Sequence, residues 1–134
     1  MVRACHRVEQ QLGSQAKDRG AAAVEFALVV VLLLTLVFGI FELGRIWLLQ
    51  SSLSAAARDA ARTMAVKNSQ AEAEDAARSV FTADGEAIGF SFDPSNCDGG
   101  GRITVTLTYD AAFMTGFFGE SVSLSGEGVM RCGG

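Results

Sequence analysis

The sequence predicts an α+β protein, in which a long N-terminal helix is followed by a small helix and a β-hairpin or short sheet. An apolar run from Ala21 to Phe41 leads into a helical pattern of apolar residues that extends to Val66. Near the C-terminus, apolar residues instead alternate with threonine, which is typical of a strand with one buried face. We therefore expect one helix with a transmembrane half and an amphipathic half, and a small domain beyond it.

The apolar run is long enough to cross a bilayer. Between Phe26 and Phe41 the only side chain with a hydrogen-bonding group is that of Thr35. As a helix, the run from residue 21 spans roughly 31 Å, which matches a hydrocarbon core of about 30 Å. Residues 21–42 are therefore expected to form a single transmembrane helix in contact with the lipid bilayer.

Residues 1–20 are expected to be a cytoplasmic leader. They are polar and mildly basic, and they end in Arg19-Gly20. A secretory signal peptide would have a shorter apolar region of about 7–15 residues. The basic residues favour a cytoplasmic N-terminus and an extracytoplasmic C-terminal domain, although Arg45, Arg58 and Arg62 follow the span on its other side.

Residues 43–66 are expected to continue the helix outside the membrane. Trp47 lies where an indole can keep its ring in the membrane interface and its N–H in water. Alanines are dense from Ala55 to Ala65, and such small side chains let another element approach closely. That element could be another subunit or the distal domain of the same chain. The apolar stripe is formed by Leu43, Ile46, Trp47, Leu49, Leu53, Ala57, Ala60, Ala61 and Met64.

Residues 67–134 are expected to form a small extracytoplasmic α+β domain. After a break at residues 67–69, Gln70 to Phe81 has the composition of a surface helix. The region from Asp84 to Gly101 is expected to be a loop, with a turn at Asp93-Pro94-Ser95-Asn96.

Two strands are expected in this domain. Ile103 to Tyr109 alternates strictly, and Ser121 to Met130 places Val122, Leu124 and Met130 on one face with two glycines. The apolar loop between the strands runs from Ala111 to Gly119 and could cap a small core, touch the bilayer or contact another subunit. It contains Phe113, Met114, Phe117 and Phe118.

The three cysteines allow one disulfide outside the cytoplasm. Cys5 lies in the leader, which leaves Cys97 and Cys132 to pair if the domain is exported. The bond would close a loop of about 36 residues and stabilise the domain by roughly 3–4 kcal/mol. The alternative is a pair of free thiols in a reducing compartment.

The composition argues against an enzyme, a metal site, a cofactor and a nucleic-acid partner. His6 is the only histidine and lies in the leader, and no CxxC, HExxH, GxSxG or phosphate-binding glycine motif is present. After Gly20, 7 basic residues stand against 13 acidic ones, so the body is acidic. We therefore expect a structural role without catalysis.

Two charged positions on the long helix stand out. Glu25 lies in the first two turns of the span, where a carboxylate is costly unless it reaches water at the interface or serves a function. Glu42 and Arg45 have i,i+3 spacing where the helix leaves the lipid. We expect either an intrahelical contact between them or a contact to a neighbouring subunit.

The segment from Arg19 to Phe26 resembles the type IV prepilin signal, because a basic leader ends in Gly20, Glu25 follows five positions later, and an apolar helix follows. The resemblance implies that a prepilin peptidase cuts between Gly20 and Ala21. Glu25 would then neutralise the new ammonium group of Ala21 in a neighbouring subunit. Assembly and recognition would thus depend on Glu25 and Phe26.

Three separated blocks are similar to the TadE-like family of minor pseudopilins from Tad (tight adherence, Flp-type) pilus systems. They are residues 20–28, 38–45 and 55–62. Phe26 stands where major Flp pilins usually have tyrosine, and the chain is longer than those pilins, which favours a minor subunit. The resemblance implies a single-pass protein of the bacterial inner membrane that could be incorporated into the pilus.

The implied partners are the prepilin peptidase, other pilins or pseudopilins and the inner-membrane assembly platform of the pilus. The alternative is a bitopic envelope protein that stays uncut and binds a partner through its outer domain. Cleavage after Gly20 distinguishes the two.

Overall fold

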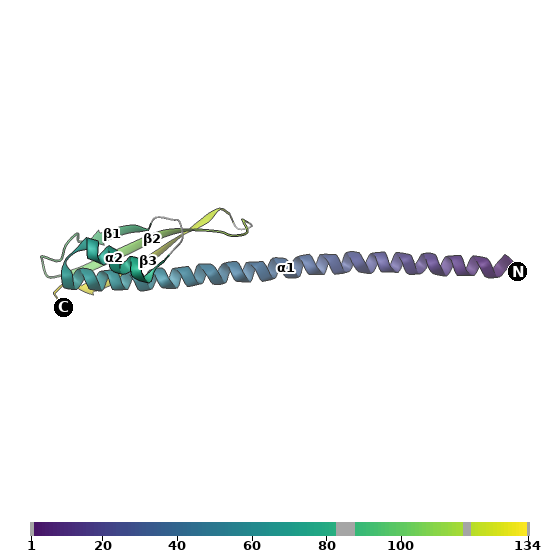
Figure 1. Cartoon of the computed structure of the whole chain (residues 1–134), viewed down its shortest axis with the longest axis horizontal. Helices are drawn as coiled ribbons and strands as arrows, with labels where there is room; N and C mark the ends of the chain where they lie inside the picture. Colours follow the sequence, from purple (N-terminus) through teal and green to yellow (C-terminus); the bar gives the residue numbers. More distant parts are fainter. Residues whose placement is uncertain (1, 83–87, 117–118, 134) are drawn as a thin grey trace. The chain divides into compact units, whose positions relative to one another are not determined.

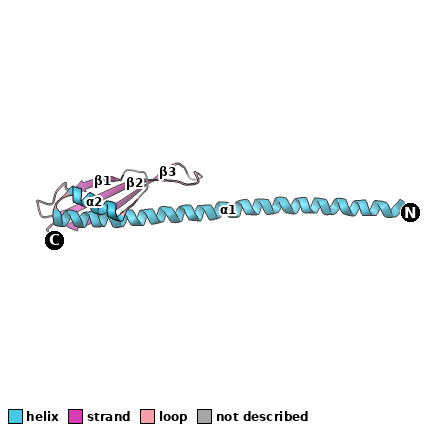
Figure 2. Cartoon of the chain, in the orientation of Figure 1, coloured by secondary structure: helices cyan, strands magenta, loops and turns pink. Residues whose placement is uncertain are grey.

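The computed structural model describes residues 2–82, 88–116 and 119–133, with side chains described from Gly20 onward. Its order of elements is two helices followed by three strands (Figures 1 and 2), which confirms the predicted α+β class. The elements are α1 (Val2–Lys67), α2 (Gln70–Val80), β1 (Gly89–Asp93), β2 (Arg102–Ala112) and β3 (Ser121–Arg131).

The chain divides into two units, Met1–Phe41 and Glu42–Gly134, and α1 contributes to both. In the first unit, α1 is long and apolar enough to cross a membrane, and its most apolar window has no buried residue. Large apolar side chains such as Leu32 and Phe41 are 70% and 73% exposed. Such a surface is unfavourable in water and suits burial in lipid or against other apolar helices.

The second unit is built on an antiparallel sheet with the strand order β1-β2-β3. Along β2, the apolar residues Ile103, Val105, Leu107 and Tyr109 are buried, whereas the residues between them are half-buried or exposed. This confirms the predicted strand and its buried face. Leu107 pairs with Phe90 on β1 and with Gly126 on β3, so these three positions share one face.

The expectation of a loop from Asp84 to Gly101 is wrong over Gly89–Asp93, which forms β1. Phe90 and Phe92 alternate with polar residues and pack against the core. The strand is short, and it gains its hydrogen bonds from β2, which lies later in the sequence. Its pattern of five residues was obscured by the adjoining turn, since Pro94 follows it directly. Residues 83–87 of the expected loop lie outside the described residues.

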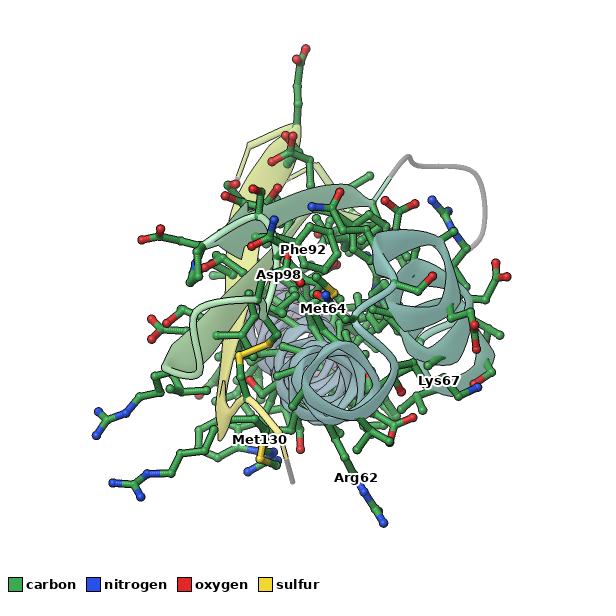
Figure 3. All side chains as sticks on the ribbon, turned by 90° about the vertical axis from the view of Figure 1, so that its left-hand side faces the viewer. Arg62, Met64, Lys67, Phe92, Asp98 and Met130 are labelled. Atoms are coloured by element: carbon green, nitrogen blue, oxygen red, sulfur yellow. A yellow bond between two sulfur atoms is a disulfide. The ribbon has the colours of Figure 1, made fainter. Side chains whose placement is uncertain are left out.

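The buried face of the sheet is covered by α2 and by the C-terminal part of α1 (Figure 1). The alanine-rich segment of α1 packs inside its own unit, with Ala56, Ala57, Ala60 and Ala61 fully buried. Viewed along α1, Met64 points into the core between α1 and the sheet, whereas Arg62 and Lys67 point outward (Figure 3). These alanines therefore serve the chain's own core, one of the two uses that the sequence left open.

The approach of α1 to β3 is close because glycines face the helix. A Cβ atom at Gly126 would lie 2.7 Å from the carbonyl oxygen of Leu53, and one at Gly128 would lie closer still to that of Ala57. Only a residue without a side chain fits at such a distance from a helix backbone. The two glycines therefore define how deeply α1 sits on the sheet.

The predicted break between the helices is present at residues 68–69. Asn68 has a positive φ of 49°, and Ser69 caps α2 by accepting a hydrogen bond from the backbone N–H of Glu72. At the other end of α2, Phe81 is buried, and its ring meets that of Tyr109 edge-on at 5.1 Å. The expected helix thus ends at Val80, with Phe81 as its C-cap.

Candidate functional site

The four residues of the prepilin-like motif lie on α1 in the first unit. Gly20, Ala21, Glu25 and Phe26 are helical and exposed, and a Cβ atom at Gly20 would meet nothing within 4 Å. Ala21 and Glu25 have i,i+4 spacing, so they share one face of the helix. Among the described side chains, none covers the motif.

Glu42 is the first residue of the second unit, and among the described residues it is the charged residue that is buried, with 3% exposure. Its Oε1 accepts a hydrogen bond from the backbone N–H of Met114 at 2.9 Å. Its Oε2 accepts from the backbone N–H of Thr115 at 3.3 Å and from the Thr115 hydroxyl at 3.2 Å. Three donors therefore compensate the carboxylate for the water it has lost.

Arg45 lies one turn further along α1 and binds the chain where the same loop begins. Its guanidinium donates a hydrogen bond to the backbone carbonyl of Ala112, the last residue of β2. Its Nε is buried and has no hydrogen-bond partner among the described residues. The positive charge of the guanidinium is also attracted to the negative charge of the Glu42 carboxylate. Glu42 is thus bonded to the loop between β2 and β3, and Arg45 is bonded to the end of β2 from which this loop starts.

The sequence singled out Glu42 and Arg45 but not their partners in the loop. These partners are mainly backbone groups of Ala112, Met114 and Thr115, which have no signature in the residue types. In the sequence, the only residue type that could have indicated a partner for Glu42 is Thr115, whose hydroxyl stands in an otherwise apolar loop. Phe117 and Phe118, which also belong to the predicted loop, lie outside the described residues.

Cys97 and Cys132 form a disulfide with their Cα atoms 5.4 Å apart. The bond joins the segment before β2 to the residue directly after β3 (yellow in Figure 3). Asn68 supports the same region, because its Oδ1 accepts from the backbone N–H of Cys97 and its Nδ2 donates to Asp98, both at 2.7 Å. The end of α1 is thereby linked to the disulfide-bonded segment.

Fold and motif together define a class of protein. It has an N-terminal helix that could span a membrane, a prepilin-like motif at the start of that span, and a small disulfide-closed α+β unit after it. Residues 20–62 match the family model described as TadE-like protein. The match covers less than half of the chain, and it agrees with the resemblance carried by the three sequence blocks. No curated protein and no solved structure matches the chain.

Proposed function

We propose that the protein is a minor pseudopilin, a structural and assembly component of a Tad pilus that contributes to pilus biogenesis, adhesion and surface attachment. The observation that carries the proposal is the position of the family match, which begins at Gly20, the glycine that ends the leader. Glu25 and an uncovered apolar helix follow. The match to TadE-like proteins supports an association with a Tad pilus.

In this proposal, α1 inserts into the inner membrane with its N-terminus in the cytoplasm, and a prepilin peptidase cuts the Gly20–Ala21 bond. The cut leaves an ammonium group on Ala21, and Glu25 of a neighbouring pilin or pseudopilin neutralises it. The pair is favourable because each charge alone would be costly in an apolar bundle. The assembly platform then holds or incorporates the trimmed subunit, whose role is structural and involves no catalysis.

The intact mass of the chain tests the cleavage. We would express it with and without the co-expressed prepilin peptidase, beside Gly20→Ala and the control Gly44→Ala. Gly44 is also a helical glycine with open space around its Cβ position. Loss of residues 1–20 only with the peptidase, blocked by Gly20→Ala and not by Gly44→Ala, supports the proposal. An uncut wild-type chain would refute it and favour a bitopic envelope protein that binds a partner through its outer unit.

The Glu25→Gln variant tests assembly separately from cleavage, because it removes the charge with little change in shape. We expect normal trimming but reduced co-purification with other pilins or pseudopilins. Glu127→Gln, a change at an exposed position on β3, is the matched control. Co-purification that is equal for wild type and Glu25→Gln would contradict the proposed charge pairing.

A further inference from the structure

Exposed apolar side chains continue on α1 beyond the apolar run, into the second unit. Leu43, Trp47 and Leu48 are 64%, 79% and 71% exposed, although the unit has a well-formed core beside them. At about 100° per residue, Trp47 and Leu48 lie on the side of α1 away from Ile46 and Leu49, which pack against that core, and Leu43 lies at the edge of that side. This side of the helix is therefore apolar and uncovered just after residue 41.

A further exposed apolar side chain, that of Met114, lies on the sheet side of α1 at the same level. It is 80% exposed. The Glu42 carboxylate binds the backbone N–H groups of Met114 and Thr115, and Arg45 binds the carbonyl of Ala112. These hydrogen bonds hold the loop against the first turn of α1 after the apolar run.

We propose that the start of the β2–β3 loop, at Met114, and the adjoining turns of α1 form a collar, consisting of Leu43, Trp47, Leu48 and Met114, that sits in the headgroup layer of the bilayer. The inference rests on the proposed insertion of α1 in a membrane. The helical residues of the collar follow the span directly in the chain. Insertion of residues 21–41 would therefore bring Glu42 and these residues to the lipid boundary.

The distribution of these side chains favours lipid over a protein partner. A docked helix would cover one side of α1, whereas the collar has apolar groups both on the side opposite the core and on the sheet side. A layer that surrounds the helix accounts for both. Tryptophan suits this layer because its ring is apolar and its N–H is polar, and methionine suits it because its side chain adapts to irregular surroundings.

The collar assigns a function to the Glu42 and Arg45 contacts. By holding the loop against α1, they fix Met114 at the level of the helix exit, so that the outer unit meets the membrane at two points, the helix and the loop. This arrangement would restrict tilting of the outer unit on the membrane surface.

Quenching of fluorescence by lipids tests the collar in the full chain, reconstituted in phosphatidylcholine vesicles. The vesicles contain lipids with a nitroxide quencher either near the headgroup or deep in the acyl chain. Trp47 is the single tryptophan and needs no label. Environment-sensitive labels are placed at Met114→Cys, Leu33→Cys and Val129→Cys in a Cys5→Ser background, with the Cys97–Cys132 disulfide intact.

We expect Trp47 and the label at position 114 to lose most of their emission to the shallow quencher and less to the deep one. The label at Val129, a 42% exposed position near the end of β3, should keep its emission. Strong deep quenching at Leu33 reports an inserted span. If Leu33 is quenched but position 114 is not, the collar is refuted while insertion stands. If Leu33 is not quenched either, the membrane insertion in the proposed function fails with it.

Discussion

Glu42 shows how one side chain can connect distant parts of a chain. It follows the apolar run directly, yet its carboxylate binds groups 72 and 73 positions later in the sequence. A buried carboxylate requires such donors, because it has given up hydration. The contact therefore positions the β2–β3 loop and satisfies the charge at the same time.

Removing the Glu42 carboxylate should release the loop. In Glu42→Ala, the amides of Met114 and Thr115 lose their acceptor, so their hydrogen exchange should accelerate by roughly an order of magnitude. Glu42→Gln retains one acceptor oxygen and should show an intermediate effect. Hydrogen–deuterium exchange by mass spectrometry checks this, with Glu127→Ala as the control on the exposed face of β3. Unchanged exchange at residues 114 and 115 in Glu42→Ala would contradict the assigned role.

At this scale the sequence identifies charged residues better than it identifies their partners. Glu42 and Arg45 are conspicuous because they stand at the end of an apolar run. Their partners are backbone amides and a carbonyl, which every residue has, and only the folded path of the chain brings them close. The predicted roles of Gly20, Ala21, Glu25 and Phe26 depend on partners outside the chain and remain predictions.

Among the elements, the packing of α1 on β3 depends on Gly126 and Gly128. The Gly128→Ala variant would force its Cβ against the backbone of Ala57, so α1 must move away from the sheet. We expect the second unit to lose about 1–3 kcal/mol of its free energy of unfolding, as in other overpacked cores.

Thermal unfolding of the full chain in mild detergent, followed by circular dichroism, measures the loss caused by Gly128→Ala. Gly99→Ala is the matched control, because its Cβ would meet nothing within 4 Å and its φ is not positive. Equal stability of Gly128→Ala and wild type would mean that α1 does not lie as close to β3 as the structure shows.

The disulfide should contribute strongly to the same unit. Replacing both Cys97 and Cys132 by serine removes a link across 35 positions, and it should lower the free energy of unfolding by about 2–4 kcal/mol. Pulse proteolysis with and without reductant checks this. Cys5→Ser should behave as wild type, and the double variant should no longer respond to reductant. A response that persists would place the redox-sensitive bond elsewhere.

Elements with a long, regular pattern could be predicted, and the one short strand could not. β2 and β3 each have eleven residues, and their alternation is visible over several periods. β1 has five, and its neighbour Pro94 favours a turn. On β3 the predicted inner face is largely correct, although Met130 is 36% exposed because it lies near the end of the strand.

At the scale of the whole molecule, α1 serves two environments. Of its two main parts, the first, residues 21–41, is apolar apart from Glu25 and uncovered, and the last forms one layer of the core in the second unit. The amino-acid composition makes the first part predictable, since few side chains other than apolar ones occur there. The second part is less predictable, because alanine suits packing between subunits and within one chain equally well.

The orientation of the chain can be tested with its own thiol. In the Gly20→Ala variant, which should retain the leader, Cys5 should react with a membrane-impermeant maleimide only after spheroplasts are lysed. A cysteine introduced at Val129, which is exposed on β3, should react in intact spheroplasts. This outcome follows from a cytoplasmic leader and an extracytoplasmic outer unit. The opposite labelling pattern would mean that the chain is inserted the other way round.

The glycines of β3 also limit the ways in which the chain can misfold. A slip of β3 along β2 by two residues would keep the same face inward, so hydrophobic alternation alone would tolerate it. Such a slip would bring Leu124 to the place of Gly126, or Met130 to the place of Gly128. Either side chain would collide with the backbone of α1 near Leu53 or Ala57. The lack of side chains at Gly126 and Gly128 thus favours one register of β3 on β2. If α1 forms early in folding, the other registers would clash with it and be disfavoured.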